Sequence, residues 1–365
     1  MSVTSTLDQR PKSGAGRTRS FPRSTLGTED PSVPKRFLVI QTAFLGDAVL
    51  ATALLEKLHV FYPDAVIDLV VRRGNHGLFD GHPFLRNVFV WDKRSNKTRN
   101  LLKLIADLRK ERYDHVINCQ RFFSTGLMAV FARGDEKVGY DKNPLSFLFS
   151  RKVEHVIGDG RHEVERLNAL IEHLTDGTRP LPRLYPTKTA RDQADHARQR
   201  EGRVHEKYVC IAPASVWFTK QWPTEKWVEL ITRLPADLHV FLIGAPGDAE
   251  LCMGIIRAGG RGSLLTNELS LLGSAALMEG AVMNYVNDSA PLHIASAMNA
   301  PVTAVFCSTV PDFGFGPLRA NGRVVQTLEK LDCRPCGLHG HRSCPMGHFR
   351  CALGIGVNQV TGPVG

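Results

Sequence analysis

Residues 37–58, FLVIQTAFLGDAVLATALLEKL, carry the pattern that decides the fold of this 365-residue chain. The segment begins as an apolar run typical of a buried strand, turns at Gly46, and continues with the periodicity of a helix. Such strand–turn–helix units often bind phosphate, but the GxGxxG fingerprint of dinucleotide-binding proteins is absent here. The turn instead carries the carboxylate of Asp47, which either caps the helix or acts in catalysis at the carboxyl end of the strand.

Strand-like and helix-like segments alternate along the rest of the chain, which predicts parallel sheets covered by helices on both faces. A first series occupies residues 35–180, and a second series, beginning near YVCIAPAS, occupies residues 205–330. A Pro-, Arg- and His-rich passage with a helical middle, residues 181–204, is predicted to link them. We therefore expect an α/β protein with two doubly wound, Rossmann-like domains whose strand ends face a central cleft.

Residues 1–34 are rich in Ser, Thr, Pro, Gly and Arg and lack apolar periodicity, so this N-terminal tail is predicted to be disordered. The tail has no apolar region of the kind that a secretory signal needs, and no apolar run approaches the roughly 20 residues that span a bilayer. We therefore expect a cytoplasmic protein. The formal charge of +10 favours acidic partners such as nucleotides or an anionic membrane surface. No RRM, KH, OB or zinc-finger pattern is readable, which argues against nucleic acid as a partner.

The junction NDSAPLH in the second series is a candidate anion site. A buried strand ends at Asp288 and Ser289, and a helix starts at once with Pro291 in its first turn, where proline is tolerated. The backbone amides of residues 289–292 are expected to be free and to point into the cleft. Asp288 alone would be enough to cap the helix. The nearby hydroxyl of Ser289 and imidazole of His293, together with the backbone amides, indicate a site that suits a pyrophosphate.

A loop in the second series, APASVWFTKQWPTEKW at residues 212–227, carries Ser215 and Lys220. Lys220 stands just before the entrance of a predicted helix that begins near Thr224. The lysine is either a solvated surface charge or a cation that neutralises phosphate at the same cleft as Asp288. We take the second interpretation as the prediction.

The eight cysteines fall into two groups. Four are isolated in apolar segments and are predicted to pack in the core: Cys119, Cys210, Cys252 and Cys307. Four others, together with His339, His341 and His348, lie in a Cys/His-rich C-terminal segment at residues 331–365: Cys333, Cys336, Cys344 and Cys351. In a cytoplasmic chain this clustering favours metal or redox chemistry over disulfides. A structural zinc site at these four cysteines is one interpretation, although the last spacing is long for a zinc knuckle, and a reduced, packed cluster is the other.

Together these stretches resemble glycosyltransferase family 9, the ADP-heptose:lipopolysaccharide heptosyltransferases, which have a GT-B fold. The matching segments span roughly residues 36–355 in the order of the family: FLVIQTAFLGDAVLATALL, HVINCQRFFSTGLMAVFARGDEKVGYDK, KQWPTEKW, LIGAPGDAE, NDSAPLHIASAMNAPVTAVF and the cysteine-rich segment. The resemblance implies an inverting transfer of a sugar, heptose from ADP-heptose in the first instance, to a lipopolysaccharide core or related lipid-linked acceptor. It implies peripheral contact with the inner membrane leaflet and no required cofactor.

The resemblance also implies roles for individual residues. Asp47 matches the catalytic base of the family. The donor-binding positions are matched by Lys220, Asp288, Ser289 and His293, and more loosely by Ser215 and Glu250. The chain departs from the family pattern at Ala290, where glycine is usual, so the close approach of the donor is expected to be hindered and the identity of the donor is in doubt.

The acceptor is expected to meet the first series. Gln120 and Arg121 follow one predicted strand, and Arg72 ends another. The planar guanidinium suits acidic sugars and phosphates, and a plain surface charge is the alternative for each arginine. Arg121 is the preferred acceptor residue. Basic helices of this half are also expected to hold the protein at an anionic leaflet.

Two expectations concern the chemistry. The helix dipole is expected to lower the pKa of Asp47 and so to weaken it as a base. A weak base is sufficient here, because the acceptor hydroxyl becomes acidic as its bond to the sugar forms. The competing enzymes are a GT-B glycosyltransferase that uses another nucleotide sugar and a sugar-nucleotide epimerase, which needs no lipid acceptor. A more remote alternative is a metal-bearing binding protein whose Cys/His segment is the active part.

Overall fold

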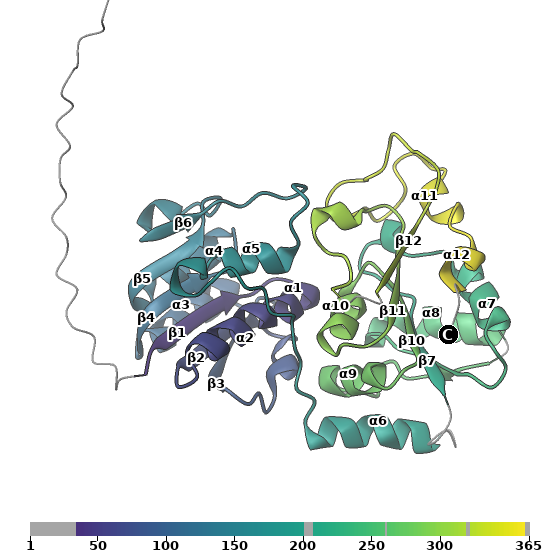
Figure 1. The fold of residues 1–365 in the computed structure, drawn as a ribbon, viewed down its shortest axis with the longest axis horizontal. Helices are drawn as coiled ribbons and strands as arrows, with labels where there is room; N and C mark the ends of the chain where they lie inside the picture. The colour runs from purple at the N-terminus through teal and green to yellow at the C-terminus, as the bar shows by residue number, and fades with distance from the viewer. Residues whose placement is uncertain (1–33, 201–206, 260, 319–321, 362–365) are drawn as a thin grey trace, which may run out of the picture. The chain divides into compact units, whose positions relative to one another are not determined.

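The computed structural model describes residues 34–200, 207–259, 261–318 and 322–361. The predicted disordered tail, apart from its last residue, and the end of the predicted linker lie outside these residues. The described residues form two sheets of six strands each (Figure 1). The predicted α/β class with two doubly wound sheets is confirmed.

The first sheet, called here the N-terminal sheet, consists of β1 (Arg36–Gln41), β2 (Val66–Arg72), β3 (Leu85–Trp91), β4 (Arg112–Asn118), β5 (Arg133–Tyr140) and β6 (Arg151–Val153). Its order is β3-β2-β1-β4-β5-β6, and all neighbouring strands are parallel. The order reverses direction at β1, so β1 and β4 are neighbours on either side of a topological switch point.

The second sheet, called the C-terminal sheet, consists of β7 (Tyr208–Ala212), β8 (His239–Leu242), β9 (Ser263–Leu264), β10 (Met283–Asn287), β11 (Val302–Phe306) and β12 (Arg323–Gln326). Its order, β12-β11-β10-β7-β8-β9, repeats the order of the first sheet when counted from β7, and it is again parallel throughout. The switch point of this sheet lies between β7 and β10.

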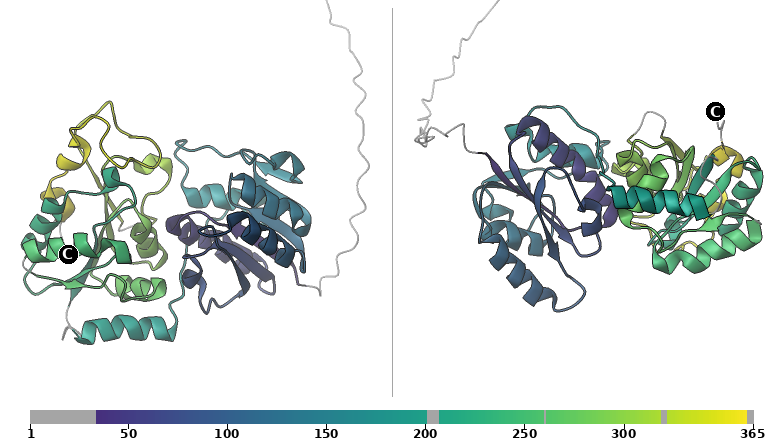
Figure 2. Two further views of the ribbon diagram at one scale, coloured as in Figure 1. Left: turned by 180° about the vertical axis from the view of Figure 1, so that it is seen from behind. Right: turned by 90° about the horizontal axis from the view of Figure 1, so that it is seen from below.

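Helices cover both faces of the N-terminal sheet (Figures 1 and 2). They are α1 (Leu45–Leu50), α2 (Thr52–Phe61), α3 (Lys97–Leu108), α4 (Phe123–Phe131) and α5 (Glu163–Ala169), with short 3-10 turns η1 (His76–Phe79), η2 (Ser146–Leu148) and η3 (Glu172–Leu174). Leu38 and Ile40 of β1 pack in one core cluster with residues of α3 and α4. Phe37 and Val39 pack in another with residues of α1, α2 and α5. Alternate residues of β1 therefore serve the two faces, as the pleat of a strand requires.

The C-terminal sheet is covered in the same way. Its helices are α6 (Lys188–Arg200), α7 (Thr224–Arg233), α8 (Ala249–Gly259), α9 (Leu271–Glu279), α10 (Ala290–Ala297), α11 (Arg350–Leu353) and α12 (Val357–Thr361), with η4 (Phe218–Lys220), η5 (Pro246–Asp248) and η6 (Pro311–Phe313). One face packs with α7, α8 and α12, and the other with α6, α9 and α10. Helix α6 forms within the segment predicted as a linker and packs against α9.

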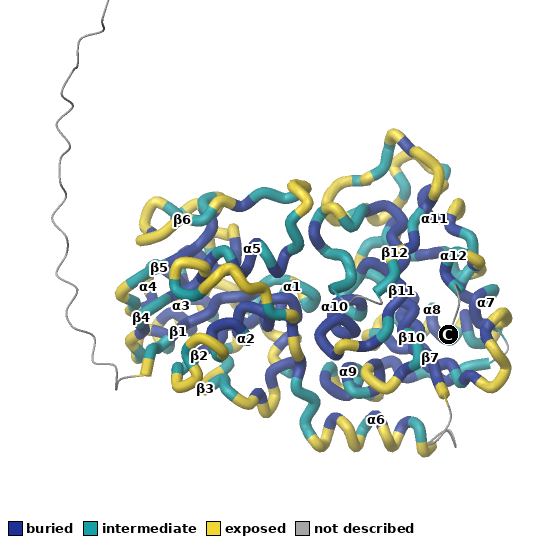
Figure 3. The backbone as a smooth tube through the Cα atoms, viewed as in Figure 1, coloured by how far each residue is buried: buried dark blue, intermediate teal, exposed yellow. Residues whose placement is uncertain are grey.

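The central strands are the most buried part of the chain (Figure 3), and β7 and β11 are buried along their whole length. The four isolated cysteines are all buried, as predicted from their apolar surroundings. Among the described residues, no helix combines the length and the apolar character needed to cross a membrane.

Candidate active site

The predicted site residues follow the central strands of the two sheets. Asp47 lies in α1 after β1, and Arg121 comes shortly after β4. Lys220 lies in η4 after β7, and Asp288 directly follows β10. Because the carboxyl ends of parallel strands meet at one edge, each pair belongs to a switch point, the usual ligand position in open α/β sheets.

Asp47 is held at the start of α1. Its Oδ2 atom accepts a hydrogen bond from the backbone N–H of Phe44 at 3.1 Å, so from the third helical position the side chain bonds back to the N-cap residue. Burial raises the pKa of the Asp47 carboxyl above its usual value, although backbone hydrogen bonds and the charges of Lys220 and Arg72 act in the opposite direction. The expected lowering of this pKa was wrong, because the loss of water around the carboxylate outweighs the helix N-terminus.

The glycine before Asp47 permits a close helix contact. A Cβ atom on Gly46 would lie 2.7 Å from Cδ2 of His293 and 3.8 Å from Cα of Ala290. Helix α1, which follows the N-terminal sheet, therefore packs directly on α10, which follows the C-terminal sheet. Burial lowers the pKa of the His293 imidazole to about 3, so the ring is neutral at physiological pH. Its Nδ1 atom lacks a hydrogen-bond partner within the described part of the chain.

Lys220 and Asp288, both predicted to bind the donor, lie in contact with each other. The Nζ atom of Lys220 lies 2.6 Å from Oδ2 of Asp288, and both side chains are largely buried. The same Oδ2 atom accepts a hydrogen bond from the hydroxyl of Thr309, also at 2.6 Å. Asp288 therefore fixes the position of the lysine head group, and Thr309, which was not predicted, fixes Asp288.

The start of α10 offers fewer free amides than expected. Of residues 289–292, Pro291 has no N–H, and the N–H of Leu292 donates to the carbonyl of Ser289 at 3.0 Å. The amides of Ser289 and Ala290 are left as donors at the helix N-terminus. The Ser289 hydroxyl makes no capping bond and instead lies 3.5 Å from the carbonyl oxygen of Asn287. The prediction of four amides was wrong, and the site has a pair.

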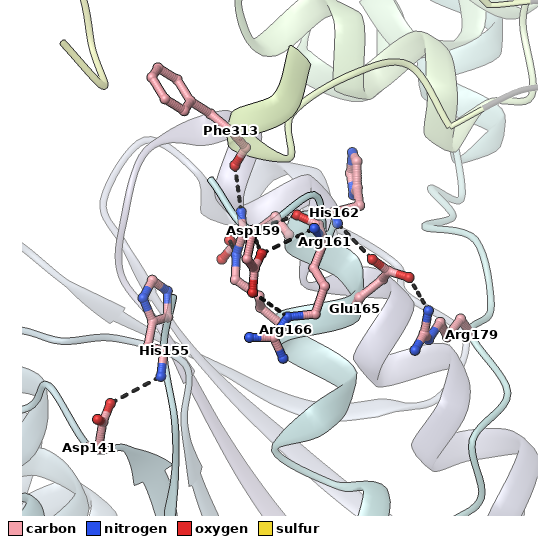
Figure 4. Close-up of polar contacts among 10 residues, drawn as sticks. Asp141, His155, Asp159, Arg161, His162, Glu165, Arg166, Arg179 and Phe313 are labelled. Atoms are coloured by element: carbon pink, nitrogen blue, oxygen red, sulfur yellow. Dashed lines mark hydrogen bonds and ion pairs between the residues drawn. The ribbon is translucent and has the colours of Figure 1, made fainter. Parts of the chain in front are cut away.

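Helix α5 brings charged residues that the sequence analysis missed. Figure 4 shows Arg166 donating from Nη2 to the carbonyl oxygen of Phe313, at 2.8 Å. The N–H of Glu163 donates to the carbonyl of Gly314 at 2.8 Å. Gly314 has φ +92°, and a Cβ there would overlap the carbonyl of Arg161. The start of α5 is therefore held against the loop that follows β11.

Glu163 is a second carboxyl group near Asp47. Its side chain accepts from Nε of Arg166 at 2.8 Å, and both side chains are buried. Burial raises the pKa of Glu163 to about 7, with the charge of Asp47 adding to the rise and those of Arg166 and Arg121 opposing it. The only sequence signal for this pair is a Glu and an Arg three residues apart, which is common on helix surfaces.

The predicted acceptor residues have different surroundings. The Arg72 guanidinium lies 5.1 Å from the centre of the Phe44 ring, beside the cap of Asp47. Gln120 is buried and donates from Nε2 to Oε1 of Gln41 at 2.6 Å, so it ties the end of β4 to the end of β1. Arg121 is exposed and acts electrostatically on Glu163. Arg72 and Arg121 are thus cations near the candidate site.

Two donor-side predictions are not brought into contact with the others. The Ser215 carbonyl accepts from Nε2 of Gln221 at 2.7 Å, which fixes the loop before η4 but does not engage the hydroxyl. Glu250 lies in the first turn of α8 and is exposed. Neither residue contacts Lys220 or Asp288 through a hydrogen bond or ion pair found in the described residues. Both remain predictions.

The clustered cysteines line one small cavity together with His348, but they do not form a metal-ligand set: Cys333, Cys336, Cys344 and Cys351. Across the described ranges, no group of three or more His, Cys, Asp or Glu side chains is arranged to hold a metal ion. Burial raises the pKa of Cys351 to about 11 and also raises that of Cys336, so these two thiols are neutral at physiological pH. Of the two interpretations drawn from the sequence, a structural zinc site finds no ligand set in the part of the chain that the structure describes.

The family model of glycosyltransferase family 9 (heptosyltransferase) matches residues 101–346. The chain belongs to glycosyltransferase family 9. It is therefore a glycosyltransferase, as the resemblance of its motifs implied, and a metal-bearing binding protein is not supported.

Relatives of this family 9 chain agree in fold. Lipopolysaccharide heptosyltransferase 3 of Escherichia coli is 27% identical over 282 residues, which cover 73% of this chain and 82% of that protein. A family 9 glycosyl transferase structure from Veillonella parvula matches with a TM-score of 0.74 at 22% identity, covering 80% of this chain and 85% of that one. The structure of Escherichia coli ADP-heptose LPS heptosyltransferase II matches with a TM-score of 0.70 at 21% identity, covering 82% and 95%. The two-sheet architecture is thus the GT-B fold of these enzymes.

Proposed function

We propose that this family 9 enzyme transfers heptose from ADP-heptose, with inversion at the anomeric carbon, to a lipopolysaccharide core or a related lipid-linked acceptor. One observation carries the proposal: α1, which holds Asp47, packs on α10, and Asp288 just before α10 is ion-paired to Lys220. A proton acceptor from one sheet and a phosphate-binding cation from the other are thereby presented to one ligand. The name of the Escherichia coli neighbour, an ADP-heptose enzyme, supports this donor. Another nucleotide sugar is the alternative.

The proposed reaction has one displacement step. The acceptor hydroxyl oxygen forms a bond to the anomeric carbon as the bond from that carbon to the phosphate oxygen breaks. The hydroxyl proton passes to the carboxylate of Asp47, and the electron pair of the broken bond leaves with the diphosphate. Attack from the face opposite the diphosphate inverts the anomeric carbon.

The surroundings of Asp47 suit this role. Burial raises the pKa of its carboxyl, which strengthens the carboxylate as a proton acceptor. The hydrogen bond from Phe44 holds one oxygen, Oδ2, so the other oxygen, Oδ1, is the one proposed to meet the acceptor hydroxyl. Capping and catalysis are therefore compatible.

The donor side stabilises the leaving diphosphate in the proposal. Lys220 and the amides of Ser289 and Ala290 supply positive charge and hydrogen bonds to the phosphates. The unpartnered Nδ1 atom of His293 is placed to pair with a polar group of the donor. The Ala290 methyl narrows the space at this helix start, which is why the donor must be established by experiment.

The acceptor is proposed to bind at the ends of β1, β2 and β4. Arg72 and Arg121 offer guanidinium groups to an acidic sugar or phosphate, and Gln120 fixes the strand ends between them. A lipid-linked acceptor requires that this edge reach a membrane surface. Phe44 and Phe122, which follow β1 and β4, are exposed and suit the boundary of such a surface.

The proposal predicts that Asp47→Asn abolishes transfer while keeping the fold. The side-chain oxygen of asparagine can still accept from the N–H of Phe44, so thermal stability and ADP affinity should change little. Loss of a general base should lower the transfer rate by about 10²–10⁴-fold. Transfer of labelled heptose from ADP-heptose to heptose-deficient lipopolysaccharide measures the rate, and calorimetry measures ADP binding.

Asp64→Asn, at an exposed aspartate after α2, is the matched control and should retain full activity. If Asp47→Asn keeps most of the rate, Asp47 is only a helix cap. Calorimetry with ADP, GDP and UDP identifies the nucleotide. Conversion of ADP-heptose without any acceptor would instead favour the epimerase alternative.

A further inference from the structure

The cysteine-rich segment, defined here as residues 331–351, is tied to the carboxyl edge of the C-terminal sheet. The guanidinium of Arg334 donates to the carbonyl oxygen of Thr309 at 2.7 Å. The N–H of Cys336 donates to the carbonyl of Ser308 at 2.8 Å. The segment therefore lies on the chain that follows β11, next to the residue that holds Asp288.

A second attachment joins the segment to the lysine loop. The N–H of Thr219 donates to the carbonyl of His341 at 3.1 Å, and the N–H of His341 donates to the Thr219 hydroxyl at 2.7 Å. A Cβ on Gly340 would lie 2.7 Å from the same hydroxyl and 3.2 Å from Cγ of Lys220. The segment thus touches the side chain of Lys220 itself.

Between the two attachments the chain makes a turn that presents a histidine. Gly337 and Gly340 have φ +71° and +75°, conformations that glycine adopts most easily. His339, between them, is exposed. Its backbone is therefore fixed on both sides while its imidazole is open to a ligand.

The charges around His339 are those of the candidate donor site. Although the surface of His339 is exposed, the surrounding chain partly shields the imidazole from water; this shielding, followed by the positive charges of Lys220 and Arg121, lowers its pKa, and Asp288 acts in the opposite direction. Lys220 and Asp288 belong to the C-terminal sheet, whereas Arg121 follows β4 of the N-terminal sheet. His339 also precedes Gly340, which lies beside the Lys220 side chain, so it is placed near the phosphate-binding cation.

We propose that His339 binds the sugar-bearing phosphate of the donor diphosphate, beside Lys220, and stabilises it as the sugar leaves. This inference rests on the proposed function. In the displacement, the bond between the anomeric carbon and the phosphate oxygen breaks, and its electron pair remains on that oxygen. His339 forms no covalent bond, and its ring N–H donates to a phosphate oxygen whose negative charge increases. The cysteine-rich segment thereby becomes part of the donor site.

Binding of a diphosphate should change the protonation of His339. Without ligand, the two nearby cations disfavour the imidazolium. An anionic diphosphate offsets both cations and raises the pKa of the imidazole. The imidazole of His339 is therefore expected to take up a proton when the diphosphate binds. Because the bound form has the higher pKa, ADP affinity in the wild type should rise as the pH falls through that pKa. The terminal phosphate of free ADP also gains a proton in this pH range, identically for every variant, so the trend is measured as wild-type affinity relative to that of His339→Ala.

The test compares His339→Ala and His339→Gln with the wild-type chain by calorimetry with ADP and with AMP, which lacks the second phosphate. Each variant should bind ADP about tenfold more weakly, the effect expected of a lost charge-assisted hydrogen bond. AMP affinity should change less than twofold. Proton uptake, measured at pH 6.5 in buffers of different ionisation enthalpy, should fall in both variants.

Arg342→Ala is the control, because it removes an exposed cation from the same segment three residues away. It should bind ADP within twofold of the wild type. Unchanged thermal unfolding shows that each variant is folded. The inference would be overturned if His339→Ala bound ADP with the same affinity and the same proton uptake as the wild type. The proposed function would still stand in that case. Failure of the wild-type chain to bind ADP, GDP or UDP would overturn both.

Discussion

At the scale of single residues, the absence of a side chain at Gly46 allows α1 to approach α10 closely. Gly46→Ala should favour helix formation by roughly 1 kcal/mol. The added methyl group, however, would meet the buried ring of His293. Overpacking of this kind costs about 1–3 kcal/mol, so we expect a net loss of stability and a loss of transfer activity. Urea unfolding and the transfer assay measure the two effects.

A double-mutant cycle isolates this contact. With His293→Ala as background, the stability cost of Gly46→Ala should disappear, because the atoms that clash are gone. Gly254→Ala in α8 is the matched control, since a Cβ there meets no atom within 4 Å. A Gly46→Ala chain as stable as Gly254→Ala would show that α1 and α10 have room to adjust.

Several site residues could be found from local pattern alone. Asp47, Lys220 and Asp288 each follow an apolar strand, so their place near the switch points was predictable from the alternation of elements. Glu163 and Thr309 were missed because their importance comes from partners far away in the chain: a buried arginine against the carbonyl of residue 313, and the carboxylate of Asp288. The raised pKa of Asp47 was also not predictable, because burial depends on the whole fold.

At the scale of elements, the first turn of α5 contains a carboxyl group whose ionisation should affect stability. Burial raises the folded-state pKa of Glu163 to about 7, above its ordinary value near 4.5. A raised pKa contributes stability that is complete below the unfolded value and is lost as the pH rises through the folded value. We expect the free energy of unfolding of the wild type to fall between about pH 5 and pH 8.

Glu163→Gln should remove this part of the pH dependence, because the amide does not ionise and still offers an oxygen to Arg166. Glu172→Gln, in η3 at an exposed position, should leave the profile as it is in the wild type. Chemical unfolding at a series of pH values gives the profiles. Parallel profiles for the wild type and Glu163→Gln would show that Glu163 has the same pKa in the folded and the unfolded chain.

The long apolar strands were readable from sequence, and the shorter elements were not. Strands β1, β7 and β11 are buried on nearly every residue and are mostly apolar, so each is readable as an apolar run. Strand β6 has three residues and β9 has two, too few for any periodicity. Strand β5 has the sequence RGDEKVGY, whose polar first half hides it.

At the scale of the whole molecule, the formal charge of +10 predicts attraction to anionic membranes. Vesicles of phosphatidylcholine with about one-third phosphatidylglycerol should sediment the protein at low ionic strength. Because exposed charges are screened by salt, binding should weaken strongly when the salt concentration is raised tenfold. Pure phosphatidylcholine vesicles are the control. Equal binding to both vesicle types would point to apolar insertion, and binding to neither would contradict the proposed membrane contact.

Two repeated halves were predictable from the alternation of elements, but their shared packing was not. One core cluster contains Val39 and Leu54 with the N-terminal sheet and Val286 and Leu292 with the C-terminal sheet. Contacts of this kind join side chains more than 200 positions apart, and hydrophobic periodicity only says that each is buried. The contact between Gly46 and His293, which shapes the candidate site, belongs to this unpredictable class.

The ion pair between Lys220 and Asp288 has a consequence for turnover. Lys220 already has an anionic partner in Asp288, so in the proposed reaction we expect the diphosphate to compete with this carboxylate for the lysine. This competition is expected to lower the affinity for the donor. After transfer, Asp288 can re-form its ion pair with Lys220 and so compete with the nucleotide product for the lysine. We therefore expect the proposed site to bind both the donor and the nucleotide product less tightly than a site whose lysine has no carboxylate partner, and inhibition by the product to be weaker.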